Sequence, residues 1–228
     1  MPHALIVAHG SPADPTPQEA RLHAIADAVG VLLPGWQVKG ATLAAEGALE
    51  TALDGLDQPL IYPFFMAEGW FTGTNLPRRL KKAGHEGLEQ MRPFGTDPAL
   101  VDLMARAATQ ATTGSRNLLI AAHGSNISGT SGDTTYAMAQ ALSIRTGFAH
   151  IECGFVEEAP FLQDVAHDMQ SGVCLPFFAL RADHVTGDIP AALDKAGFDG
   201  PCLPPIGEDP GVPTLIASAL RRQNLSDR

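Results

Sequence analysis

The segment LLIAAHGS, residues 118–125, is an apolar run that ends abruptly in His-Gly-Ser. An unbroken apolar run of this kind is typical of a strand that is covered on both faces within a parallel sheet. The segment ALIVAHGS, residues 4–11, has nearly the same sequence. The chain therefore places a histidine at the end of a predicted buried strand twice, at His9 and at His123.

A longer stretch of the chain is also repeated. LIYPFFMAEGWFTGTNLPRRLKKAGHEG begins at residue 60, and VCLPFFALRADHVTGDIPAALDKAGFDG begins at residue 173. The two align without a gap, so that Pro63 falls on Pro176 and Gly84 on Gly197. We therefore predict an internal duplication, with an N-terminal half at residues 1–114 and a C-terminal half at residues 115–228.

Short apolar runs alternate with amphipathic stretches in each half, which predicts strands connected by helices. In the second half, strands are expected near residues 117–122, 150–156 and 172–178, and helices near residues 132–146, 160–170, 189–197 and 212–223. Right-handed crossovers then give two similar doubly wound, Rossmann-like α/β halves, which we expect to face each other across a cleft. In such sheets the ligand binds beyond the carboxyl ends of the strands, where both histidines fall.

The composition indicates a globular protein that binds a small molecule. Of 228 residues, 45% are apolar, and no apolar stretch approaches the roughly 18 residues that span a bilayer. The net charge of −10 disfavours nucleic acid and anionic membranes as partners. The three cysteines form no C-x-x-C motif, which argues against a disulfide framework or a thiolate zinc site. We expect a cytoplasmic protein.

Three motifs of the second half resemble a known family. These are HGS at residues 123–125, GFVEEAP at residues 154–160 and PFFALRADHVTGDIP at residues 176–190. Together they are similar to the class II chelatases (CbiX-like), lyases that insert cobalt or iron into sirohydrochlorin in cobalamin or siroheme biosynthesis. The resemblance covers nearly the whole chain. It implies an enzyme with no permanently bound cofactor, whose substrates are an anionic tetrapyrrole and Co²⁺ or Fe²⁺.

The resemblance also implies a catalytic and metal-binding site made of His123, Glu157 and His184. Glu158 adjoins Glu157, and because side chains alternate along a strand only one of the two is expected to face the site; we favour Glu157. Neutral imidazole binds Co²⁺, Fe²⁺ and Ni²⁺ and titrates near pH 6.5, so it also suits the removal of pyrrole protons. These residue types do not select one of the three metals.

The first half has lost most of these groups. In the gapless alignment Phe71 stands opposite His184, and Ala44 stands opposite Glu157. His9 is followed by a loop that contains three prolines, each of which lacks a backbone N–H donor. We therefore predict that the N-terminal half is degenerate and that the C-terminal half is catalytic.

The loop after His123 is instead rich in glycine and hydroxyl groups and leads into a predicted helix, features that suit carboxylate binding. The predicted substrate-binding residues are Ser125, Asn126, Ser128, Gly129, Thr130 and Ser131. Sirohydrochlorin, as the resemblance implies, carries eight carboxylates, so local attraction must offset the acidic net charge. Arginines would help if they face the site: Arg78, Arg79, Arg145 and Arg181.

Other functions are compared with this interpretation. A histidine phosphatase needs an arginine just before its histidine, where this chain has Ala8 and Ala122, and no G-x-S-x-G serine elbow is present. A ferrochelatase acting on protoporphyrin and a non-catalytic tetrapyrrole or metal carrier remain as alternatives. A duplicated chain supplies both halves by itself, which makes a monomer plausible and leaves a homodimer open.

Overall fold

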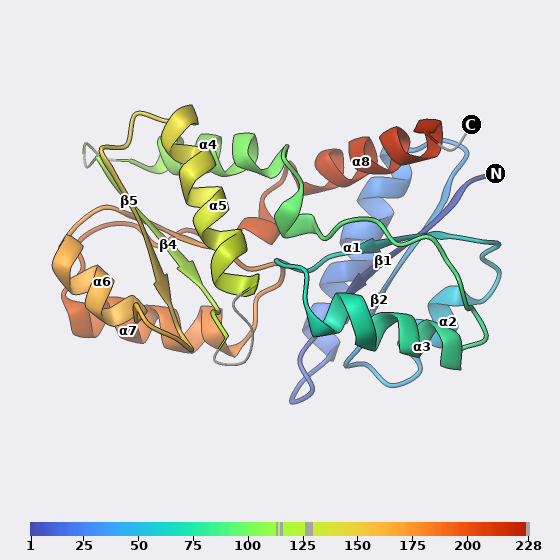
Figure 1. The fold of residues 1–228 in the computed structure, drawn as a ribbon. Helices are drawn as coiled ribbons and strands as arrows, with labels where there is room; N and C mark the ends of the chain where they lie inside the picture. The colour runs from blue at the N-terminus through green and yellow to red at the C-terminus, as the bar shows by residue number, and fades with distance from the viewer. Residues whose placement is uncertain (113, 115, 126–129, 227–228) are drawn as a thin grey trace. The chain divides into compact units, whose positions relative to one another are not determined.

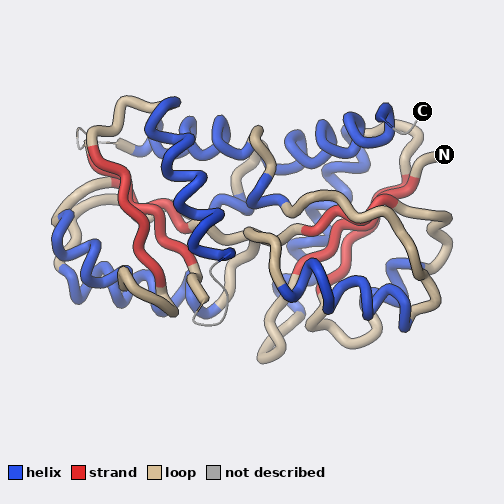
Figure 2. The backbone as a smooth tube through the Cα atoms, viewed as in Figure 1, coloured by secondary structure: helices blue, strands red, loops and turns tan. Residues whose placement is uncertain are grey.

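A computed structural model describes residues 1–112, 114, 116–125 and 130–226 of the chain. The chain forms two compact units, and each contains a three-stranded parallel sheet with helices on both faces (Figures 1 and 2). This confirms the predicted α/β fold of two similar halves. No helix in the described residues is long and apolar enough to cross a membrane.

The first unit consists of residues 1–97 and 210–228. Its sheet has the strand order β2-β1-β3. The elements of this unit are β1 (His3–Ala8), α1 (Thr16–Leu32), β2 (Gln37–Thr42), α2 (Ala48–Leu53), β3 (Leu60–Pro63), the π-helix η1 (Phe71–Asn75), α3 (Leu76–Lys82), the 3₁₀ turn η2 (Phe94–Thr96) and the C-terminal helix α8 (Val212–Ser226).

The second unit consists of residues 98–209 and has the strand order β5-β4-β6. Its first strand begins and ends where the sequence predicts, and the other elements agree to within a few residues. The elements are α4 (Leu100–Ala111), β4 (Asn117–Ala122), α5 (Thr130–Arg145), β5 (His150–Phe155), α6 (Leu162–Met169), β6 (Val173–Pro176), the π-helix η3 (His184–Asp188), α7 (Ile189–Ala196) and the 3₁₀ turn η4 (Ile206–Glu208).

The central strand β4 is buried on both faces, as its unbroken apolar sequence predicts. Leu119 and Ala121 point to one face, where they pack with apolar residues of α6 and α7. Alternate residues such as Ile120 point to the other face, which α5 and α4 cover. Burial on both sides holds β4 in place, so the residues that follow it start from a fixed position.

The last helix of each repeat packs in the unit that contains the other repeat. Helix α4 ends the first repeat in sequence, yet it packs against α5 and β6 of the second unit. Helix α8 ends the second repeat and packs against α1 of the first unit (Figure 1). The compact units therefore differ from the two sequence repeats, whose boundary at residues 114 and 115 stays a prediction about the duplication.

Matched ion pairs accompany this exchange. Arg222 of α8 lies 3.3 Å from the carboxylate of Asp97, within the first unit. Arg106 of α4 lies 3.0 Å from the carboxylate of Asp209, within the second unit. Each aspartate follows the 3₁₀ turn of its own repeat and pairs with the helix that the other repeat contributes. The exchange is thus a repeated feature of the two units.

The exchange predicts which sheet a core mutation will loosen. Ile216 of α8 and Met104 of α4 occupy matching positions in the alignment, and both are fully buried. Ile216→Ala and Met104→Ala should each cost about 2–5 kcal/mol. Hydrogen exchange should then accelerate first in β1–β3 for Ile216→Ala and first in β4–β6 for Met104→Ala. The opposite result, faster hydrogen exchange first in β4–β6 for Ile216→Ala or first in β1–β3 for Met104→Ala, would contradict the packing of each helix with the other repeat.

Candidate functional site

Three segments of the second unit meet at the carboxyl edge of its sheet. Strand β4 is central and pairs in parallel with β5 on one side and with β6 on the other. His123 follows β4 directly, and Glu157 comes two residues after β5. His184 is the first residue of η3, beyond β6. Because parallel strands end at the same edge, all three predicted ligands are brought to one place.

A glycine turn sets the orientation of His123. Gly124 has a φ of +76°, and a Cβ at this position would lie 2.7 Å from Cγ of Glu158, so the turn requires glycine. The carbonyl oxygen of Gly124 lies 2.8 Å from Nδ1 of His123. A carbonyl only accepts hydrogen bonds, so Nδ1 carries the proton and donates it. The lone pair of His123 is therefore on Nε2, the other ring nitrogen.

His184 is oriented by a carboxylate in the same turn. Its Nδ1 lies 2.6 Å from Oδ2 of Asp188, the last residue of η3. Asp188 also precedes α7, where aspartate commonly caps a helix, but its side chain makes no cap hydrogen bond. The neighbouring residues Val185 and Ile189 are buried and anchor the turn. A carboxylate that accepts from Nδ1 leaves the Nε2 lone pair of His184 available to bind a metal.

The three side chains come close enough to share one ion. One ligand atom each from His123, Glu157 and His184 lies within 4.8 Å of the other two. The imidazole rings meet edge to face, with centroids 4.6 Å apart and an interplanar angle of 86°. His123 and Glu157 are exposed and His184 is half-buried, so an ion can enter from solvent. Two neutral imidazoles and one carboxylate suit Co²⁺ and Fe²⁺ and leave coordination positions open.

The two adjacent glutamates diverge. Glu157 belongs to the cluster, and its backbone N–H donates to the carbonyl of His123 at 2.9 Å, which extends the pairing of β5 with β4. Oε1 of Glu158 instead accepts a hydrogen bond from the backbone N–H of Ser125 at 3.0 Å. The geometry therefore agrees with the preference for Glu157 as the group that faces the histidines.

The predicted substrate-binding loop is described only in part. Ser125 is half-buried, and its N–H is occupied by Glu158. Asn126, Ser128 and Gly129 lie outside the described residues, and Thr130 and Ser131 are the first residues of α5. Two candidate arginines have acidic partners: Arg181 lies 2.8 Å from Glu208 and Arg145 lies 2.5 Å from Asp102.

The first unit repeats the backbone of this site but lacks the counterparts of Glu157 and His184. Gly10 has a φ of +79° and accepts a hydrogen bond from Nδ1 of His9 at 2.7 Å. The N–H of Ala44 donates to the carbonyl of His9 at 2.9 Å, as Glu157 does in the second unit. The ring of Phe71 meets that of His9 edge to face at 4.3 Å, in the place that His184 takes beside His123. Of the three predicted ligand positions, the described part of the first unit has a metal-binding residue type at one, His9.

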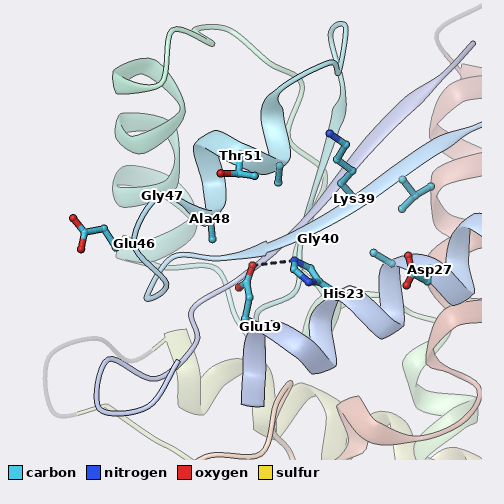
Figure 3. Close-up of a pocket in the computed structure, with 12 residues that line it drawn as sticks. Glu19, His23, Asp27, Lys39, Gly40, Glu46, Gly47, Ala48 and Thr51 are labelled. Atoms are coloured by element: carbon cyan, nitrogen blue, oxygen red, sulfur yellow. Dashed lines mark ion pairs between the residues drawn. The ribbon is translucent and has the colours of Figure 1, made fainter. Parts of the chain in front are cut away.

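A pocket of about 450 Å³ lies in the first unit, between α1, β2 and the start of α2 (Figure 3). Glu19 and His23 form an ion pair of 3.1 Å on its wall. Glu19 also accepts a hydrogen bond of 2.6 Å from the N–H of Thr42, so it stabilises the end of β2. Among the described residues, His123, Glu157 and His184 are the group whose spacing could hold a metal. The described residues that line this pocket therefore form no competing three-residue metal cluster.

Sequence reasoning missed Asp188 as a partner of the site. The signal was present, because Asp188 follows His184 by four residues within the quoted motif and side chains at this spacing meet on a helix. The π-helical form of the turn is not predictable from the apolar pattern, which covers too few residues to define a period.

Comparisons with known proteins agree with this architecture. The CbiX family model matches the chain twice, at residues 3–111 and 117–223, as a duplication requires. The structure of CbiX described as the terminal enzyme for biosynthesis of siroheme in denitrifying bacteria has a TM-score of 0.87 and 44% sequence identity, covering 97% of this chain and 99% of that one.

Two further relatives are more distant. A probable sirohydrochlorin cobaltochelatase of Halobacterium salinarum is 25% identical over 223 residues, which cover 83% of this chain and 76% of the relative. SirB from Bacillus subtilis with Fe³⁺ has a TM-score of 0.79 at 15% identity, covers 97% of this chain and 95% of SirB, and supports the fold alone. Since the family model spans almost all of both repeats and a solved CbiX shares 44% of its residues over nearly the full length, the chain belongs to the CbiX family.

Proposed function

We propose that this chain is a sirohydrochlorin chelatase, which inserts Co²⁺ or Fe²⁺ into the macrocycle at the site formed by His123, Glu157 and His184. One observation carries the proposal: one possible ligand atom from each of these residues lies within 4.8 Å of the other two, at the carboxyl edge of the second sheet. The names of the relatives support the same substrate, since one is a probable sirohydrochlorin cobaltochelatase and another serves siroheme biosynthesis.

The side chains are suited to both halves of the reaction. Insertion needs an ion that is held and then released, and it needs two pyrrole N–H protons to be accepted. The Nε2 lone pairs of His123 and His184 bind the ion first and accept protons once the ion has moved into the macrocycle. Glu157 balances the positive charge of the ion and then of the imidazolium that forms. The metal is a substrate in this scheme, and no resident cofactor takes part.

The donor set does not select between cobalt and iron. Imidazole and carboxylate coordinate both, so metal supply decides which product forms. Bacillus subtilis SirB has been solved with Fe³⁺, and a chelatase of a related subspecies has been solved with cobalt, at 15% identity to this chain in each case. We propose the same breadth for this chain.

The segment from residue 125 to residue 131 is proposed to bind the carboxylates of the substrate. It includes the start of α5, and the first N–H groups and the dipole of a helix favour anions. Glu158 already occupies the N–H of Ser125 and lies beside the first turn of this helix, near Gly132. The substrate must therefore use other donors of this segment or displace Glu158.

An absorbance assay tests the reaction itself. The protein should accelerate the spectral change that accompanies insertion of Co²⁺ or Fe²⁺ into sirohydrochlorin, and it should leave protoporphyrin unchanged. Turnover with protoporphyrin alone would favour the ferrochelatase alternative. A stable complex with metallated product and no acceleration would indicate a carrier.

The asymmetry of the two units gives a second prediction. His123→Ala and His184→Ala should each reduce the rate of insertion by about 10²-fold, the scale expected when a positioned acid or base is removed. His9→Ala is the matched control, because it alters the same strand end in the unit that lacks the other two groups. A larger loss for His9→Ala than for His123→Ala would place the reaction in the first unit and contradict the proposal.

The hydrogen bond of Asp188 gives a third prediction. Asp188→Ala should weaken Co²⁺ binding by about 10- to 100-fold in calorimetric titrations, because Nδ1 of His184 loses the partner that fixes its tautomer and orientation. Asn75→Ala, at the equivalent place in η1, should leave Co²⁺ affinity unchanged. Asp188 is exposed, so the thermal midpoint of the metal-free protein should not move. A lowered midpoint with unchanged affinity would make Asp188 merely structural.

A further inference from the structure

Two cysteines of the second unit lie opposite each other at the outer edge of β6. The segment that follows α7 pairs there with β6 in parallel, and Cys174 and Cys202 are direct partners in this pairing. The N–H of Cys174 donates to the carbonyl of Pro201 at 2.9 Å, and the N–H of Leu203 donates to the carbonyl of Cys174 at 2.9 Å. Both thiols are free.

The spacing of this pair is compatible with a disulfide. Paired strands run about 4.8 Å apart, and a disulfide needs Cα atoms about 4.4–6.8 Å apart. Directly opposite residues point to the same face of a sheet, so the sulfur atoms are neighbours. A side-chain hydrogen bond between Cys174 and Cys202 agrees with this placement.

The two thiols differ in access and in acidity. Cys174 is fully buried, whereas Cys202 is exposed. The hydrogen bond from Cys174 lowers the pKa of Cys202, against the opposing effect of partial burial, and the nearby Arg181 guanidinium lowers this pKa further. The same hydrogen bond and burial raise the pKa of Cys174. Cys202 is therefore the thiol that ionises first and the one that a reagent reaches.

The fold itself does not require cysteine at either position. The first unit has the same bridge between Ile61 and Gln90, and the N–H and carbonyl of Ile61 make the same hydrogen bonds there. The backbone of the pairing is therefore maintained without thiols. The pair is a chemical feature that the second unit alone carries among the described residues.

We propose that Cys202 and Cys174 form a redox-active dithiol that reacts with hydroperoxides, with Cys202 as the attacking thiol and Cys174 as the resolving thiol. The Cys202 thiolate attacks one peroxide oxygen, the O–O bond breaks, and a sulfenic acid forms as hydrogen peroxide releases hydroxide, which is protonated to water. The thiol of Cys174 then attacks the Cys202 sulfur, an S–S bond forms, and a second water leaves. Two thiols and one peroxide give one disulfide and two waters.

The test treats the full-length protein with one equivalent of hydrogen peroxide. In a Cys153→Ala background, two thiols should disappear together, the mass should fall by about 2 Da, and dithiothreitol should reverse the change. A non-reduced tryptic digest should link the peptide of residues 146–181 to the peptide of residues 196–221. Cys153 is buried and lies on β5, so its removal simplifies the map without touching the pair.

Two variants separate the roles of the thiols. Cys202→Gln places at this position the residue type that the first unit has, so it should fold, and it should abolish disulfide formation. Cys174→Ala should leave Cys202 as a sulfenic acid that a cyclic 1,3-diketone traps. The proposal would be overturned if the diketone trapped a sulfenic acid on Cys174 of Cys202→Gln to the same extent. It would also be overturned if the Cys153→Ala protein gained oxygen but formed no disulfide-linked peptide.

Discussion

The in-register pairing of β4 between β5 and β6 determines the position of two of the proposed metal ligands, His123 and Glu157. Backbone hydrogen bonds continue past the ends of the strands, since the N–H of Glu157 still donates to the carbonyl of His123. These two proposed ligands are thus positioned by backbone contacts that do not depend on their own side chains. His184 is brought in separately, by a turn that Val185 and Ile189 anchor in the core. The proposed metal site is therefore arranged by the fold itself, before any ion binds.

The comparison of the two units separates what the fold needs from what the chemistry needs. Both units keep the glycine turn after the histidine, because the strand end cannot be built without its positive φ. Between these two sites, only the one in the second unit has a carboxylate and a second imidazole, while Ala44 and Phe71 take their places in the first. The same backbone arrangement therefore forms in the first unit without a carboxylate or a second imidazole at these positions. The same holds for the bridge between Cys174 and Cys202, because Ile61 and Gln90 form the equivalent bridge in the first unit.

Most of the fold was predictable, because buried strands and amphipathic helices leave strong patterns in the sequence. The strand at residues 117–122 was predicted in full, and the repeated glycines and prolines revealed the duplication. The proposed ligands came from motifs, and the structure brings all three together. What the sequence did not reveal is which sheet each terminal helix covers. Helices α4 and α8 have matching apolar residues, and an apolar face does not indicate which sheet the helix packs against. The partnership of Asp188 with His184 was missed although their spacing of four residues indicated it, whereas the π-helical form of the turn could not be predicted from any period.

Because α4 and α8 are exchanged, the compact units of this chain do not coincide with its sequence repeats. The C-terminal repeat, residues 115–228, contains all three proposed ligands but lacks α4, whose buried residues cover α5 in the second unit. It also ends with α8, whose apolar face packs against α1 of the first unit and would be exposed without it. Residues 98–209 instead include α4, the whole β5-β4-β6 sheet and the ion pair of Arg106 with Asp209. Each compact unit therefore contains a terminal helix of the other repeat.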